Sequence, residues 1–249
     1  MKTDWDYTHL ADAYLARPSY AAAVIDAMLK ITSSSSTEKI CDVGAGVAHL
    51  TIMLAERAKT VVAIEPNTAM RNLGIKRTSN FPRVTWFEGT GESTGQLSNC
   101  FDMVTFGSSF NVCDRELALE ETARILKPGG WFICLWNNRN LNDPIQAEIE
   151  NIIKEEVPAY KYGSRRQDQR AVLERNTLFR SALHLNGTII HEQDIQSCIE
   201  AWRSHATLAR QAGARFEFVV DAIENYLQGL DIDTMQIPYI TNVWLAQLK

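Results

Sequence analysis

The sequence lacks a long apolar run and an excess of basic residues. None of its hydrophobic segments approaches the roughly 20 residues that a helix needs to cross a bilayer, and the first residues have no signal-peptide core. Its 25 Lys and Arg are scattered among 30 Asp and Glu, which gives a net charge of -5 over 249 residues. We therefore expect a soluble cytoplasmic protein that binds neither a membrane nor nucleic acid.

Cysteine is scarce, and no pair has Cys-x-x-Cys spacing. Two of the five cysteines, Cys41 and Cys134, fall inside apolar runs that we expect to be strands. The others are Cys100, Cys113 and Cys198. This spacing indicates reduced core residues rather than disulfides or metal ligands, and no other ligand cluster predicts a metal site.

The segment from Lys39 to Thr51 predicts a buried strand, a glycine turn and a helix that begins at Val47. Without a Cβ, Gly44 and Gly46 allow a sharp turn and a close approach to a ligand, and the helix start offers free N–H groups. A glycine turn that only packs a helix on a strand is the alternative interpretation.

A second apolar run, Thr60 to Glu65, ends in a carboxylate about 20 residues further on, where an acid can accept both ribose hydroxyls. A dinucleotide site usually has a third glycine that admits the pyrophosphate, but Ala48 and His49 stand there. The two motifs together therefore favour a nucleoside cofactor without a diphosphate.

With these motifs, most of the first 140 residues resembles the class I S-adenosylmethionine-dependent methyltransferases, closest to the small-molecule group called type 11. In that family an acid and a Gly-x-Gly turn follow the first strand, and a ribose-binding acid ends the second. The resemblance implies S-adenosyl-L-methionine as the cofactor. It assigns cofactor binding to Asp42, Gly44, Ala45, Gly46, Glu65, Pro66, Met70, Thr90, Gly91, Glu92, Gly107 and Ser108, and also to Tyr14 and Arg17 of the N-terminal segment.

Two positions depart from the family pattern. Ala48 replaces a glycine that relatives often have, which narrows the space near the methionine moiety. Asn111 and Val112 stand where many relatives carry a His-Trp pair, so no histidine base is expected there. For Tyr14 and Arg17 the alternative is a ring packed on the sheet edge and a solvated guanidinium.

Apolar runs alternate with helical patterns, which predicts an α/β fold with a mainly parallel, Rossmann-like sheet. The resemblance implies seven strands in the order 3-2-1-4-5-7-6. We expect one domain over residues 1–249, with a helical cap over residues 1–30 and a lid insertion over residues 140–185. Helices are predicted over residues 18–29, 114–126 and 145–156, and late strands over residues 131–136, 188–196 and 239–248.

Acceptor residues are expected beyond the carboxyl ends of the fourth and fifth strands, where ligands bind in open α/β sheets. Arg139 can hold a carboxylate bidentately, although it also fits a solvated loop residue. For Arg203 and His205 the alternative is a surface ion pair beside a partly buried histidine. The candidates are Asn111, Asn137, Arg139 and His205 for catalysis, and Phe110, Asn138, Tyr162 and Arg203 for substrate binding.

Methyl transfer from a sulfonium needs an aligned acceptor more than a covalent catalyst. Because no histidine follows the fourth strand, a small molecule methylated at a carboxylate or hydroxyl oxygen is favoured, with N-methylation of a small molecule or peptide as the second choice. Two other classes stay open: an NAD(P)-dependent Rossmann oxidoreductase, which the missing third glycine disfavours, and a catalytically silent cofactor-binding module. The oligomeric state is not predicted.

Overall fold

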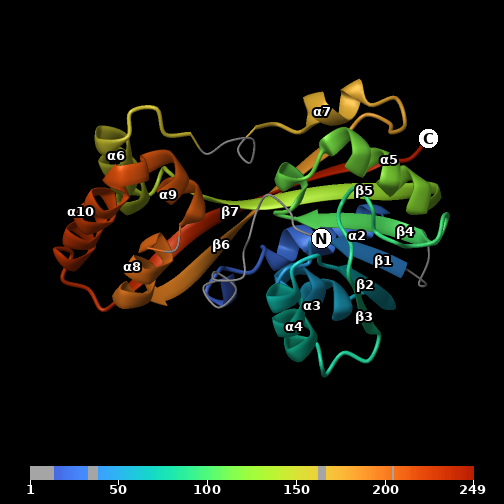
Figure 1. Cartoon of the computed structure of the whole chain (residues 1–249), viewed down its shortest axis with the longest axis horizontal. Helices are drawn as coiled ribbons and strands as arrows, with labels where there is room; N and C mark the ends of the chain where they lie inside the picture. Colours follow the sequence, from blue (N-terminus) through green and yellow to red (C-terminus); the bar gives the residue numbers. More distant parts are fainter. Residues whose placement is uncertain (1–13, 33–38, 162–166, 204) are drawn as a thin grey trace.

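Seven strands form one mixed sheet in the order β3-β2-β1-β4-β5-β7-β6 (Figure 1). The computed structural model describes residues 14–32, 39–161, 167–203 and 205–249. Strands β1 to β5 run parallel to one another, and β7 lies antiparallel between β5 and β6. The strands are β1 (Lys39–Val43), β2 (Thr60–Ile64), β3 (Val84–Phe87), β4 (Phe101–Gly107), β5 (Leu126–Arg139), β6 (Leu183–Asp194) and β7 (Thr234–Gln247). The predicted sheet is confirmed.

Helices cover both faces of the sheet, as Figure 1 shows. Those of the main body are α2 (Ala22–Thr32), α3 (His49–Ala55), α4 (Thr68–Arg77), α5 (Arg115–Ile125) and the short α7 (Arg170–Arg175). Asp114 caps α5 by accepting the N–H groups of Glu116 and Leu117. Asp143 caps the predicted helix over residues 145–156 in the same way. Both predicted helix starts are confirmed, because the short acid satisfies N–H groups that the first turn leaves unpaired.

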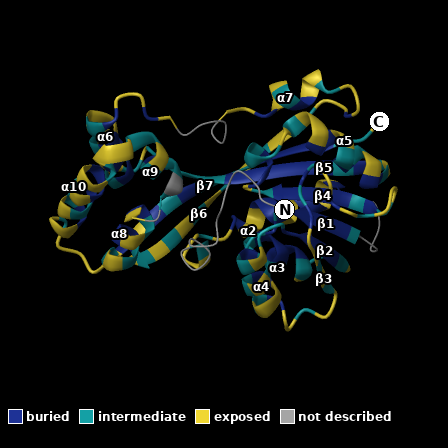
Figure 2. Cartoon of the chain, viewed as in Figure 1, coloured by how far each residue is buried: buried dark blue, intermediate teal, exposed yellow. Residues whose placement is uncertain are grey.

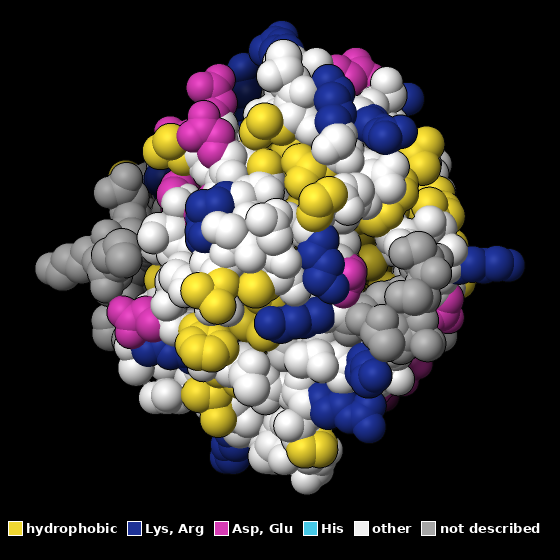
Figure 3. All heavy atoms as spheres, turned by 90° about the vertical axis from the view of Figure 1, so that its right-hand side faces the viewer, with side chains coloured by type: hydrophobic (Ala, Val, Ile, Leu, Met, Phe, Trp, Pro, Cys, Tyr) yellow, Lys and Arg dark blue, Asp and Glu magenta, His cyan; other side chains and the backbone are white. Residues whose placement is uncertain are grey.

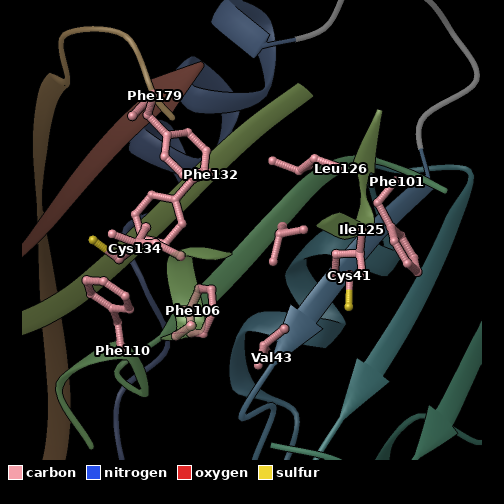
Figure 4. Close-up of a cluster of buried hydrophobic side chains, with 14 of the residues drawn as sticks. Cys41, Val43, Phe101, Phe106, Phe110, Ile125, Leu126, Phe132, Cys134 and Phe179 are labelled. Atoms are coloured by element: carbon pink, nitrogen blue, oxygen red, sulfur yellow. The ribbon is translucent and has the colours of Figure 1, made fainter. Parts of the chain in front are cut away.

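The inner strands are apolar along their whole length because helices bury both of their faces. In β1 and β2 four of five residues are buried, whereas the edge strand β6 alternates between exposed and partly buried residues (Figure 2). One face of the sheet packs a phenylalanine cluster from β4, β5 and the loops beside them (Figure 4). The other face packs α2 and α3 on residues such as Ile133, Leu135 and Val243.

A second group of helices packs on the far ends of β6 and β7, and we call it the helical lobe (Figure 1). It consists of α6 (Pro144–Glu156), α8 (Ile195–Arg203), α9 (Ala206–Ala212) and α10 (Phe216–Gln228). Its own core contains Ile153, Trp202 and Ile223 together with Ile237 of β7. Strands β5 to β7 are longer than predicted, and the additional residues 234–238 of β7 include Ile237 of the lobe core.

Several predicted boundaries need correction. The helix after the glycine turn begins at His49 rather than Val47, because Ala48 is left-handed with φ 75°. The segment 140–185 divides between two places: α6 packs in the helical lobe, while Leu173 and Phe179 pack in the core of the main body. Its role as a substrate cover stays a prediction, and residues 1–13 of the predicted cap lie outside the described residues.

Candidate functional site

The glycine turn between β1 and α3 is held against the end of β2. The N–H groups of Gly44 and Ala45 both donate to the carbonyl of Ile64, at 2.8 and 3.0 Å. Gly44 has a φ of 67°, and a Cβ there would lie 2.4 Å from the Cβ of Ser109. Gly46 also has a positive φ, 56°, but a Cβ added to it would meet no atom within 4 Å. The first glycine is therefore required by packing, and the second borders open space.

Glu65 lies directly beside this turn and is only 7% exposed. Its Oε2 accepts the N–H of Gly46 at 2.8 Å, and its Oε1 accepts the N–H of Asn67 at 2.9 Å. Burial raises the pKa of the carboxyl, against the lowering effect of these two hydrogen bonds. Because each carboxylate oxygen has a second lone pair, Glu65 can still accept two hydroxyl groups of a ligand.

Asp42 is buried behind the turn, with 1% exposure. Its two oxygens accept the hydroxyls of Thr51 at 2.6 Å and Thr105 at 2.9 Å, which joins β1 to α3 and β4. Burial raises the pKa of Asp42 to about 6. These contacts make Asp42 a support for the turn, while direct contact with a ligand stays a prediction.

Other predicted cofactor-binding residues lie after the ends of β2 and β3. Met70 is buried against Val47, next to the partly exposed Pro66. Thr90 and Ser93 bond each other's backbone, and Glu92 accepts the N–H of Asp114 at 2.7 Å. A Cβ on Gly91 would lie 2.5 Å from Cys113 Sγ, so only glycine fits this loop against the start of α5.

Tyr20, which sequence reasoning did not assign to the site, covers the end of β4. Its hydroxyl lies 3.0 Å from Ser108 Oγ, and a Cβ on Gly107 would approach the same hydroxyl to 3.1 Å. Ser108 has a left-handed φ of 62°, a conformation that is uncommon for residues other than glycine. The structure thus brings Gly107 and Ser108 together with the segment that leads into α2.

His49 anchors the N-terminal segment and was also missed. Its Nε2 forms a 2.7 Å hydrogen bond with the carbonyl oxygen of Tyr14, and burial lowers its pKa to about 4. The guanidinium of Arg17 lies 3.6 Å from the centre of the Tyr14 ring. A groove of about 460 Å³ between α2, α3 and β6 is lined by His49, Tyr20 and Ile189, among others. The predicted Tyr14–Arg17 pair therefore lies next to the glycine turn.

The predicted acceptor residues do not gather at one point. Asn111 accepts the indole N–H of Trp136 at 2.9 Å. Phe110 is fully buried among Phe106 and Phe132, with ring centres 5.4 and 5.0 Å away (Figure 4). Asn138 is partly buried in β5. Tyr162 lies outside the described residues.

Two further candidates, Arg203 and His205, lie in the helical lobe. Arg203 forms ion pairs with Glu200 and Glu224, and its side chain is 41% exposed. His205 accepts the N–H of Leu208 and stacks on Trp202. These contacts match the structural alternatives stated for both residues, and their catalytic or binding roles stay predictions.

Positively and negatively charged side chains are interspersed on the surface that Figure 3 shows, with hydrophobic ones among them. Among the described residues, no group of three or more His, Cys, Asp or Glu could hold a metal ion. No helix in the described part of the chain is long and apolar enough to cross a membrane.

Comparison with known proteins shows that this chain is similar to methyltransferases. Residues 41–134 match the family model of a methyltransferase domain. An uncharacterized methyltransferase of Mycobacterium tuberculosis is 34% identical over 124 residues, which is 50% of this chain and 48% of that protein. A ubiquinone/menaquinone biosynthesis C-methyltransferase of Zymomonas mobilis is 30% identical over 113 residues, 44% of this chain and 47% of its own. The chain thus spans about half the length of the curated relatives it matches.

Among solved structures, phosphoethanolamine N-methyltransferase 2 of Haemonchus contortus, in complex with phosphomonomethylethanolamine and S-adenosylhomocysteine, has a similar fold. Its TM-score is 0.57 at 15% identity, and the match covers 97% of this chain and 57% of that one. At this identity the likeness concerns the fold alone.

Proposed function

We propose that the chain, whose residues 41–134 match the model of a methyltransferase domain, is a class I S-adenosylmethionine-dependent methyltransferase. It binds S-adenosyl-L-methionine beside the Gly44–Gly46 turn and transfers the methyl group to a small molecule. The observation that carries the proposal is the open space at Gly46 next to the buried carboxylate of Glu65. A ribose with two vicinal hydroxyls suits a carboxylate whose remaining lone pairs face such a space.

The residues present fit this cofactor. Glycine at position 46 leaves room where any side chain would intrude, and Glu65 is held by two backbone N–H groups so that it cannot turn away. The turn is less suited to binding a pyrophosphate, because Ala48 replaces the third glycine and is fully buried. This favours the adenosyl donor over a nicotinamide dinucleotide.

S-adenosylmethionine, when bound, supplies an electrophilic methyl group, and the protein's part is to exclude water and to orient the acceptor. Holding two reactants in line is worth effective molarities of ~10⁵ to 10⁸ M. At the end of β4 the hydroxyls of Tyr20 and Ser108 lie 3.0 Å apart. Burial raises the pKa of the Tyr20 hydroxyl, so it stays protonated and can donate a hydrogen bond.

The acceptor is proposed to be a carboxylate or hydroxyl oxygen of a small molecule. An anionic oxygen needs no base, and Asn111 and Val112 stand where a histidine base would directly follow β4. Nitrogen is the second choice, in a small molecule or a peptide, since the structural neighbour from Haemonchus contortus is named as an N-methyltransferase. A protein that only binds the donor is the remaining alternative.

Isothermal titration with S-adenosylhomocysteine and S-adenosylmethionine tests the first part. Micromolar binding of both is expected, together with no stabilisation by NAD or NADP. Absence of binding at millimolar donor would refute the proposal. Incubation of a metabolite extract with methyl-labelled donor tests the second part: label in a small organic product supports the enzyme, and label in none, despite donor binding, supports the silent module.

A further inference from the structure

Arg139, the last residue of β5, lies among aromatic side chains at the junction of the main body and the helical lobe. Its guanidinium carbon is 4.0 Å from the ring centre of Trp202 in α8 and 5.9 Å from that of Tyr239 in β7. Trp202 is 1% exposed and Tyr239 9%. Stacking of this kind fixes the plane of a guanidinium and leaves its N–H groups directed outward along the edges.

The N–H groups of Arg139 have no partner in the described part of the chain. Its Nε is buried without a hydrogen bond, and none of the ion pairs among the described residues includes Arg139. A second buried nitrogen without a partner, Nε2 of His191, belongs to the same region. Buried polar atoms are nearly always satisfied in folded proteins, so the Nε–H of Arg139, which can only donate, indicates a missing acceptor.

The two residues lie on one face of the sheet. Arg139 is paired with Tyr239, and His191 lies two residues beyond Ile189, which is paired with the same tyrosine. The His191 and Tyr239 rings are 6.4 Å apart. Burial lowers the pKa of His191, the backbone of Ala16 raises it, and the charge of Arg139 lowers it further. The positive charge of Arg139 therefore acts on His191, and no carboxylate among the described residues forms an ion pair with Arg139.

Arg139 and His191 lie at a distance from the end of β4, where the methyl group of the donor is expected. Leu135 of β5 is paired with Gly107, the last residue of β4. Arg139 follows Leu135 by four residues, which at 3.2–3.4 Å per residue places it about 13 Å further along the strand. A group bound by Arg139 is thus too far from the end of β4 to be the methylated atom.

We propose that Arg139, with His191 beside it, binds the carboxylate of an elongated, partly aromatic methyl acceptor whose methylated atom lies roughly 10 Å away, toward the end of β4. The carboxylate accepts two N–H groups from the fork of Arg139, the geometry that guanidinium and carboxylate share. It also stabilises the protonated form of His191, whose Nε2 then becomes a second donor. The position of the methylated atom near the end of β4 rests on the proposed methyl transfer. The binding of a carboxylate by Arg139 can be tested separately.

The probes are 4-hydroxycinnamate and its neutral carboxamide, which differ only in the group that Arg139 is proposed to bind. Their affinities are measured by titration with and without S-adenosylhomocysteine, for the wild type and for the variants Arg139→Gln, Arg139→Lys and Arg215→Gln. Arg215→Gln is the matched control, because Arg215 lies at the start of α10 in the same lobe but is exposed and paired with Glu156. Thermal unfolding and S-adenosylhomocysteine affinity report whether each variant is folded.

The wild type is expected to bind the acid at least tenfold more tightly than the amide. Arg139→Gln should abolish this preference, Arg139→Lys should keep only part of it, and Arg215→Gln should leave it intact. Equal affinity for acid and amide, binding of neither probe by a folded protein, or a full preference in a folded Arg139 variant would overturn the inference. If S-adenosylhomocysteine does not bind while the acid preference is present, the proposed function fails and the anion site stands.

Discussion

Thr241 donates its hydroxyl hydrogen to Oδ1 of Asn137 at 2.5 Å. The same hydroxyl oxygen accepts the N–H of Ala21 at 2.8 Å, and Asn137 Nδ2 donates to the carbonyl of Ser19 at 2.9 Å. These bonds tie β5 and β7 to the segment that enters α2. Asn137, which the sequence indicated as a catalytic residue, thus has both ends of its amide engaged in holding Tyr20 and its neighbours over the sheet.

Thr241→Val should therefore destabilise the protein by about 2 to 3 kcal/mol, because valine has nearly the same shape but leaves the Ala21 N–H and Asn137 Oδ1 without partners. Thr241 is 0% exposed, so water cannot replace the lost bonds. Urea unfolding measures the change. Thr188→Val, at an exposed position of β6, is the control and should stay within about 0.5 kcal/mol of the wild type. Equal effects of the two substitutions would contradict this role.

The first two strands and the glycine turn between them were predictable because their signals are local. A buried strand, a glycine turn and a strand-end acid occupy short, contiguous stretches, and the caps Asp114 and Asp143 are single residues with a known preference. The resemblance then supplied the strand order that no local pattern contains.

Of the helical lobe, α6 was predicted from the sequence, whereas α8, α9 and α10 were missed. In α10 the buried residues Val219, Val220, Ile223 and Leu227 follow a helical period, which a count of the pattern would have found. Strand β6 has no buried residue and thus no apolar run that marks its start. Contacts such as Tyr20 with Ser108 and Arg139 with Trp202 join residues far apart in the chain, and only the folded structure brings them together.

Gly44→Ala is predicted to be costly for a steric reason. The added Cβ would lie 2.4 Å from Ser109 Cβ, in addition to the strain of a left-handed alanine. Gly95 is a matched control, because its φ of 69° equals that of Gly44 within 2° (φ 67°) while a Cβ there meets nothing within 4 Å. Gly95→Ala should cost about 1 kcal/mol, and Gly44→Ala about 1 to 3 kcal/mol more from the overpacking. Equilibrium unfolding of both variants checks the difference, and equal costs would exclude the close packing.

Gly46→Ala separates cofactor binding from folding. Gly46 and Gly95 have φ values of 56° and 69°, and a Cβ on either would enter open space. Both substitutions should therefore lower the stability by a similar amount, about 1 kcal/mol. Only Gly46→Ala should weaken S-adenosylhomocysteine binding, by tenfold or more, because its methyl group enters the space beside Glu65. Titration of the two variants decides the matter, and unchanged affinity in Gly46→Ala would place the donor elsewhere.

Asp42 should make the stability depend on pH between about 4 and 7. Burial raises its pKa from 3.8 to about 6, so the folded protein keeps a proton that the unfolded chain releases near pH 4. The free energy of unfolding contributed by this group is thus full below pH 4 and falls as pH rises through 6, by up to about 3 kcal/mol at 1.36 kcal/mol per pKa unit. Asp42→Asn cannot ionise, and it preserves an oxygen that accepts one threonine hydroxyl. Relative to the wild type, this variant should gain stability as pH rises from 4 to 7, which urea unfolding at each pH measures. A difference between the two proteins that stays constant over this range would show that Asp42 does not titrate there.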